Sequence, residues 1–323
     1  LLIILIELCN LYVLSVIIDI MQYFSTRNTS LKKSFVDVVM QGLSSDGGLF
    51  IPSEWPKVNI NNFKGFNYSE LAFEVISPFC NDIINQEELR NIINNTYKIF
   101  HHPKVAPLVN IKKNKYILEL FYGPTFSFKD YALQFIVNIL EHLLNNKQKK
   151  ISIIGATSGD TGSAAIEACK FKKNIDIFIL HPCGKTSEVQ RRQMTSIIEE
   201  NVNNIAIKGN FDDCQKIVKN LFMDQYLLSK TNITTINSIN WARIIAQSVY
   251  YYWSFLQLEE DIKKVDFIVP SGNFGNVYAG KVARNMGFNR TCGRISDRLN
   301  TVLDALLDTQ RLVESFGNIR PPD

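Results

Sequence analysis

One lysine lies where a turn meets the start of an apolar helix, in the segment GPTFSFKDYALQF at residues 123–135. Gly123 and Pro124 break any preceding strand, and the apolar spacing that follows predicts a largely buried helix. Lys129 therefore lies at the mouth of an apolar element, where desolvation disfavours the ammonium. An amine in this setting is suited to Schiff-base chemistry. The alternative is a surface pair of Lys129 and Asp130 in the first helical turn.

Two later segments each run from a predicted strand through a small-residue loop into a predicted helix. They are KKISIIGATSGDTGSAAIEACKF at residues 149–171 and DFIVPSGNFGNVYAGKVARNMGF at residues 266–288. Gly272 and Gly275 let the backbone approach a ligand closely. Amides at a helix N-terminus can converge on an anion, and those in this loop belong to Asn273, Phe274, Gly275 and Asn276. Either loop alone is weak evidence, because glycine loops also serve as plain strand-to-helix turns.

A third segment, INSINWARIIAQ at residues 236–247, places Asn240 and Arg243 near the start of another helix. Arginine suits bidentate contact with phosphate, although Arg243 could instead form an ion pair on the helix surface. Together with Lys129, the two loops and this arginine form a constellation. It fits a cofactor phosphate held by one loop and a substrate held by the other.

At these residues the chain resembles the threonine synthase family, whose members use pyridoxal phosphate. Residues 123–135 resemble the lysine motif, residues 155–165 the loop that faces the substrate, and residues 271–276 the loop that holds the cofactor phosphate. Residues 23–52, YFSTRNTSLKKSFVDVVMQGLSSDGGLFIP, resemble the N-terminal signature of the family. That last match is narrow, whereas the other motifs are shared with related dehydratases and lyases.

The resemblance implies an α/β protein of PLP fold type II, the tryptophan-synthase-β-like fold. That fold has mainly parallel sheets with helices on both faces, and the N-terminal portion is expected to be helical. It also implies conversion of O-phosphohomoserine and water to L-threonine and phosphate, a step of threonine biosynthesis. Lys129 would form the Schiff base with the cofactor and shuttle protons at the substrate Cα and Cβ. The expected substrate contacts are Ser158, Asp160, Thr161, Asn240 and Arg243. Two alternatives are a phospho-lyase that makes no threonine and an inactive remnant.

The order of predicted elements agrees with that fold. Residues 66–79 and 85–100 have the spacing of amphipathic helices. Strands and helices then alternate, and the expected strands cover residues 115–121, 150–155, 175–182 and 204–209. Alternation of this kind implies a mainly parallel sheet covered by helices. Both glycine loops then fall at the carboxyl ends of strands, where ligands bind in open α/β sheets.

Composition excludes several classes of protein. The chain has 323 residues and a net charge of +4, which is spread along it without a nucleic-acid-binding patch. Six cysteines show no CxxC spacing, so Cys80, Cys169 and Cys214 are expected as buried free thiols in a reducing, cytoplasmic compartment. His101 and His102 are adjacent and cannot both face one metal site on a regular element, so no metal is expected. The oligomeric state is not indicated.

The two ends depart from the family pattern, so the expected division is 1–20, 21–98, 99–288 and 289–323. Residues 1–20 form an apolar run about as long as a membrane span. It lacks the basic region of a signal peptide, and we interpret it as an extension foreign to the family rather than an anchor. Residues 299–316 predict one helix in a divergent tail. No Ser or Thr partner for a pyridine nitrogen is found there, so the catalytic domain of residues 99–288 is expected to be incomplete.

Overall fold

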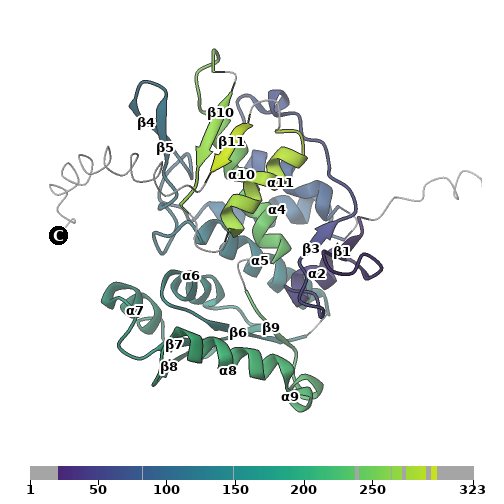
Figure 1. Cartoon of the computed structure of the whole chain (residues 1–323), viewed down its shortest axis with the longest axis vertical. Coiled ribbons are helices and arrows are strands. Elements are labelled where there is room, and N and C mark those ends of the chain that lie inside the picture. The colour runs from purple at the N-terminus through teal and green to yellow at the C-terminus, as the bar shows by residue number, and fades with distance from the viewer. Residues whose placement is uncertain are drawn as a thin grey trace, which may run out of the picture.

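The computed structural model describes residues 21–81, 83–147, 149–236, 240–262, 264–270, 274–288 and 292–296. The apolar run of residues 1–20 and the helix predicted over residues 299–316 lie outside these ranges. Figure 1 shows a central group of helices with a four-stranded sheet on one side of it and two short strand pairs on the other. No helix within the described ranges has the length and apolarity needed to cross a membrane.

The N-terminal portion combines short antiparallel strands with helices, and its helices confirm the sequence prediction. Its strands, in the order β2-β1-β3, are Tyr23–Ser25 (β1), Lys32–Lys33 (β2) and Phe50–Pro52 (β3). Its helices are Phe35–Gln41 (α2), Tyr68–Ile76 (α3) and Gln86–Tyr97 (α4), with short 3-10 turns at Ile60–Phe63 and Ser77–Phe79. Ser34 and Asn67 are the N-caps of α2 and α3, and each forms a capping box. In this motif the N-cap side chain accepts from a backbone N–H in the first turn, and the side chain of that first-turn residue accepts from the N-cap backbone N–H.

A parallel sheet forms the part of the fold predicted from the alternating pattern. Its strands, in the order β8-β7-β6-β9, are Val202–Ile207, Ile175–Pro182, Ile151–Ala156 and Ile233–Thr234. Helices α6 (Asp160–Cys169) and α7 (Glu188–Thr195) lie toward one face. Helix α8 (Phe211–Met223) covers the other, and α9 (Gln225–Lys230) follows it. Because side chains alternate along a strand, Ile177 and Ile179 join the main core while Leu180 packs with Cys214 of α8.

The strand expected over residues 115–121 is not part of that sheet. Strand β5 (Lys115–Leu118) pairs antiparallel with β4 (Leu108–Lys112) in a hairpin. The two strands are joined by a tight turn in which Asn114 has a φ of 59°, and a connection this short cannot link parallel strands. On the same side of the molecule, β10 (Val265–Ile268) pairs parallel with β11 (Cys292–Ser296), so the first part of the expected tail continues the α/β pattern.

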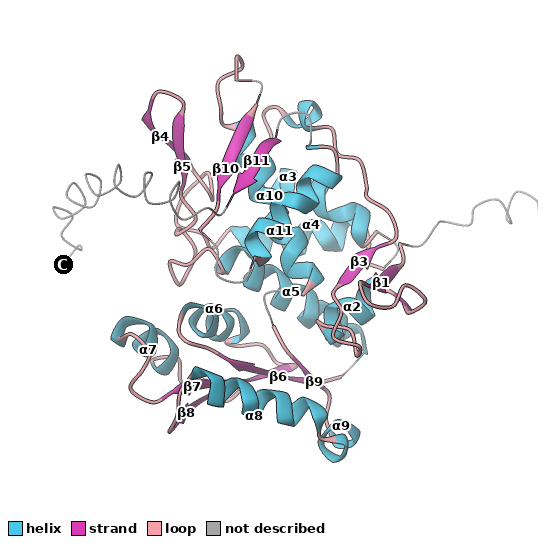
Figure 2. Cartoon of the chain, viewed as in Figure 1, coloured by secondary structure: helices cyan, strands magenta, loops and turns pink. Residues whose placement is uncertain are grey.

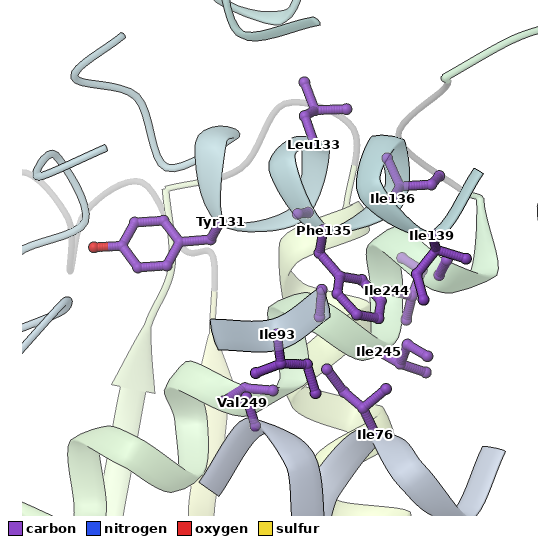
Figure 3. Packing of buried hydrophobic residues seen from close by; sticks show 14 of the residues in the cluster. Ile76, Ile93, Tyr131, Leu133, Phe135, Ile136, Ile139, Ile244, Ile245 and Val249 are labelled. Carbon is purple, nitrogen blue, oxygen red and sulfur yellow. The ribbon is translucent and has the colours of Figure 1, made fainter. Parts of the chain in front are cut away.

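The core is centred on helices α5 (Asp130–Lys147) and α10 (Trp241–Leu256), with α11 (Gly275–Asn285) beside α10. Figure 3 shows the packing between them: Phe135 and Ile139 of α5 lie close to Ile244 and Ile245 of α10. Helices α3 and α4 pack against the same pair. One cluster of buried side chains therefore runs from the N-terminal portion to the inner face of the sheet. The buried free thiols expected at Cys80, Cys169 and Cys214 are confirmed.

Candidate active site

The turn that carries the lysine is organised around a buried carboxylate. Asp130, the first residue of α5, is fully buried. It accepts hydrogen bonds from the backbone N–H of Thr125 at 2.8 Å and from its hydroxyl at 2.7 Å. Gly123 is needed because a Cβ there would lie 2.4 Å from the Asp130 Cβ. Burial raises the pKa of Asp130 above its ordinary value. The surface Lys129–Asp130 pair is therefore wrong, and Asp130 serves to shape the turn.

Lys129 instead makes its ion pair with the loop that follows β6. Its Nζ lies 2.9 Å from Oδ2 of Asp160, the first residue of α6. The Lys129 side chain is 16 % exposed, and its Nζ also lies 4.3 Å from the centre of the Phe128 ring. The acidic side chain is favourably placed at a helix N-terminus. Two segments singled out in the sequence, 31 residues apart, thus meet at one charged contact.

The loop that holds Asp160 is folded by Thr157. The Thr157 hydroxyl accepts hydrogen bonds from the N–H groups of Gly159 at 3.0 Å and Gly162 at 2.9 Å. Of the other predicted substrate contacts in this loop, Ser158 is exposed and Thr161 is half-buried. Ser158 is therefore an exposed residue of the same loop that places Asp160 against Lys129.

The second glycine loop is only partly described. Gly272 and Asn273 lie outside the described residues. Phe274 has a left-handed backbone with a φ of 58°, and α11 begins at the buried Gly275. The start of α11 is a helix N-terminus, and backbone N–H groups in that position can bind anions.

Two tyrosines of α10 attach this helix start to the lysine side of the site. The Tyr250 hydroxyl donates to Oδ1 of Asn276, and the Tyr251 hydroxyl donates to the Asn276 carbonyl at 2.8 Å. The Tyr250 ring also meets the ring of Tyr131 edge-on, with 6.0 Å between centroids. Because Tyr131 follows Lys129 by two residues, α10 connects the glycine loop to the lysine turn.

Arg243 and Asn240 lie at the start of α10, and both are buried. The Asn240 side chain accepts from the Ala242 N–H at 3.0 Å and donates to the Val39 carbonyl at 3.1 Å, so both of its polar atoms are engaged. Arg243 is 2 % exposed, and its Nε and Nη1 have no hydrogen-bond partner among the described residues. Burial lowers the pKa of Arg243 to about 10. The surface ion pair is wrong, and a buried guanidinium with unused donors is suited to an anion.

Helix α7 contributes two side chains that the sequence interpretation missed. The Gln190 side-chain amide donates to Oδ1 of Asp160, and Gln193 Nε2 donates to the Thr125 carbonyl at 3.2 Å. Neither residue belongs to a motif. One signal was available: α7 follows the carboxyl end of the strand predicted at residues 175–182, where ligands bind in folds of this kind.

These residues fit a phosphorylated aldehyde such as pyridoxal phosphate. The aldehyde requires a primary amine that is largely shielded from water, which Lys129 supplies. The phosphate requires backbone N–H groups at a helix start, which α11 supplies. Within the described ranges, no cluster of three or more His, Cys, Asp or Glu side chains is arranged to hold a metal.

Two family models match the chain. Residues 22–97 match the threonine synthase N terminus, and residues 99–286 match the pyridoxal-phosphate dependent enzyme model. The chain is 47 % identical over 294 residues to the threonine synthase of Pseudomonas aeruginosa, covering 90 % of this chain and 63 % of that protein. It is 44 % identical over 305 residues to the threonine synthase of Saccharomyces cerevisiae, covering 88 % of this chain and 59 % of that protein.

Solved structures give the same relationship. A pyridoxal-phosphate-bound threonine synthase from Brucella melitensis superimposes with a TM-score of 0.79 at 44 % identity, covering 83 % of this chain and 58 % of that one. The yeast threonine synthase superimposes with a TM-score of 0.79 at 42 % identity, covering 85 % of this chain and 57 % of that one. The chain spans about three-fifths of the length of the curated relatives it matches. It belongs to the family of pyridoxal-phosphate-dependent enzymes.

Proposed function

We propose that the protein is a threonine synthase that converts O-phosphohomoserine and water to L-threonine and phosphate. The observation that carries this proposal is the contact of 2.9 Å between Lys129 Nζ and Asp160. It joins the lysine turn to the loop that would face the substrate. The family membership and the relatives named above support the same reaction.

In this proposal Lys129 binds the aldehyde carbon of pyridoxal phosphate through its amine, and the start of α11 binds the cofactor phosphate. The loop residues involved are Gly272, Asn273, Phe274, Gly275 and Asn276. The cofactor, when bound, supplies an electron sink for the substrate carbon skeleton. With the cofactor and substrate bound, Lys129 would move protons at the substrate Cα and Cβ. Its largely shielded position keeps bulk water from competing for those protons.

The substrate groups have candidate partners in the loop that contacts Lys129 and at the start of α10. Ser158, Asp160 and Thr161 would bind the amino-acid end, because they share the loop that meets the lysine. Arg243 would bind the γ-phosphate, because its Nε and Nη1 are buried and unused. Asn240 stays a predicted phosphate contact, although its side chain is already engaged with Val39 and Ala242. The buried free thiols support a reducing compartment, and we propose the cytoplasm.

Borohydride reduction in the presence of pyridoxal phosphate tests the assignment of Lys129. We expect cofactor mass on the peptide that contains Lys129 and none on that peptide in Lys129→Ala. A matched control is Lys170→Ala, whose ammonium pairs with Glu167 on the surface of α6 and whose loss should leave the label in place. Cofactor mass on a different lysine would refute the proposal. Chromatography of the products separates threonine formation from a phospho-lyase reaction.

A further inference from the structure

A chain of polar contacts runs from the start of α7 to the lysine. Ser187, the N-cap of α7, donates through its hydroxyl to Gln190 Oε1 at 2.8 Å. Gln190 Nε2 donates to Oδ1 of Asp160. Oδ2 of Asp160 accepts from Lys129 Nζ at 2.9 Å. Because Gln190 Oε1 accepts from Ser187, the amide nitrogen of Gln190 is the end that faces the carboxylate.

The surroundings leave Gln190 little room to turn elsewhere. A Cβ at Gly159 would lie 2.1 Å from Gln190 Oε1, so the absence of a side chain at Gly159 makes space for the amide. Behind it, the Ser163 hydroxyl lies 3.4 Å from the Gln190 carbonyl, which ties the α7 backbone to α6. The amide is thus placed by α6 and α7 together, at the helix start that carries Asp160.

We propose that Gln190 is a positioning residue that holds the Asp160 carboxylate against Lys129. An aspartate can rotate its carboxylate, and an amide N–H bound to one oxygen stops that rotation. The other oxygen then points at Lys129, so the amine is kept at one place between the lysine turn and the substrate loop. This inference rests on the proposed role of Lys129, and it adds α7 to the site.

The test is reductive methylation of the chain by formaldehyde and cyanoborohydride, with the rate at each lysine followed by mass spectrometry. The Lys129–Asp160 pair must open before this amine can react, so freeing Asp160 should make Lys129 react faster. We expect Gln190→Ala to raise the Lys129 rate by about tenfold, as for a lost hydrogen bond to a charged group. Gln190→Glu fills the same space without an N–H donor, so it should raise the rate at least as much. Arg192→Ala, an exposed change on the same helix, should leave it unchanged.

A double-mutant cycle shows whether Gln190 acts through Asp160. Asp160→Asn alone should also speed the modification of Lys129, and adding Gln190→Ala should then change little, because the two side chains form one unit. A Lys129 rate in Gln190→Glu equal to the parent would overturn the proposal, as would full additivity with Asp160→Asn or an equal rise in Arg192→Ala. Because no cofactor is used, this result is independent of the borohydride experiment, which alone decides whether Lys129 binds the cofactor.

Discussion

At the scale of single residues, the predicted site residues Lys129 and Arg243 are both shielded cations, but they differ in their partners. Lys129 has a carboxylate partner at 2.9 Å, whereas the Nε and Nη1 of Arg243 have none among the described residues. A buried charge without a partner costs folding free energy. The lowered pKa of Arg243 reflects the same cost of burial. The phosphate contact proposed above for Arg243 would offset that cost.

Arg243→Met should therefore separate stability from ligand use. We expect the free energy of unfolding of the ligand-free protein to rise by roughly 1–4 kcal/mol, because an unpaired buried charge is replaced by an apolar chain of similar length. The value of kcat/KM for O-phosphohomoserine should fall by a factor equivalent to roughly 2–5 kcal/mol, which is typical of a lost contact to a buried charge. Urea denaturation and kcat/KM measure the two quantities. A variant that loses stability and keeps its kcat/KM would show that Arg243 is structural.

Asp130 gives a prediction about pH. Burial raises its pKa in the folded state, so the folded protein holds this proton more tightly than the unfolded chain does. The stabilisation that this proton gives the folded state is fully present below the ordinary pKa of 3.8. It is lost as the pH rises through the raised pKa of the folded state. The stability advantage of the parent over Asp130→Asn should thus shrink as the pH rises above 3.8. Urea denaturation at several pH values checks this, and parallel profiles would contradict it.

At the scale of elements, α10 connects the parts of the site. It carries Arg243 at its start, and Tyr250 further along touches both Tyr131 and Asn276. Helix α10 packs on both α5 and α11, and all three belong to the central group of helices (Figure 2). The position of the glycine loop relative to Lys129 therefore depends on side chains of α10.

Tyr250→Phe removes the hydroxyl that holds Asn276 and should weaken pyridoxal-phosphate binding by up to about tenfold, the worth of one hydrogen bond. Tyr252→Phe is the matched control, because its hydroxyl donates at 2.9 Å to Ala283, well beyond the start of α11. Both variants should lose a similar free energy of unfolding. Titration of cofactor absorbance measures the affinity. Equal cofactor affinities in the two variants would show that α10 does not place the loop.

At the scale of the whole molecule, the predicted boundary at residues 98 and 99 does not divide the core. Trp241 of α10 is surrounded by rings from the N-terminal portion: its centroid lies 6.0 Å from Tyr23, 6.1 Å from Trp55 and 5.5 Å from Phe79. The Asn240 amide also donates to Val39 of α2. The N-terminal portion thus covers an apolar side of α10 that would otherwise face water.

Trp241→Ala should therefore destabilise both portions together. Loss of this buried ring should cost about 3–5 kcal/mol of unfolding free energy, and unfolding should stay a single transition because the core is shared. Urea denaturation followed by circular dichroism and by fluorescence of the remaining tryptophans checks both points. Two separate transitions, with only one of them shifted, would show that the portions fold independently.

The sequence by itself determined most of the elements, because local patterns are enough for that. Runs of aliphatic residues predicted β6 and β7, and helical spacing predicted α3 and α4. A lysine after a Gly-Pro turn predicted a reactive amine, which the borohydride experiment tests. Only the tertiary structure decided the partners. It paired Lys129 with Asp160 instead of the adjacent Asp130, and it brought Gln190 to Asp160. It also buried Arg243 with no partner for its Nε and Nη1 among the described residues. It also placed residues 115–118 in a hairpin. Partner choice depends on where side chains distant in sequence point once the helices pack, and no local pattern contains that information.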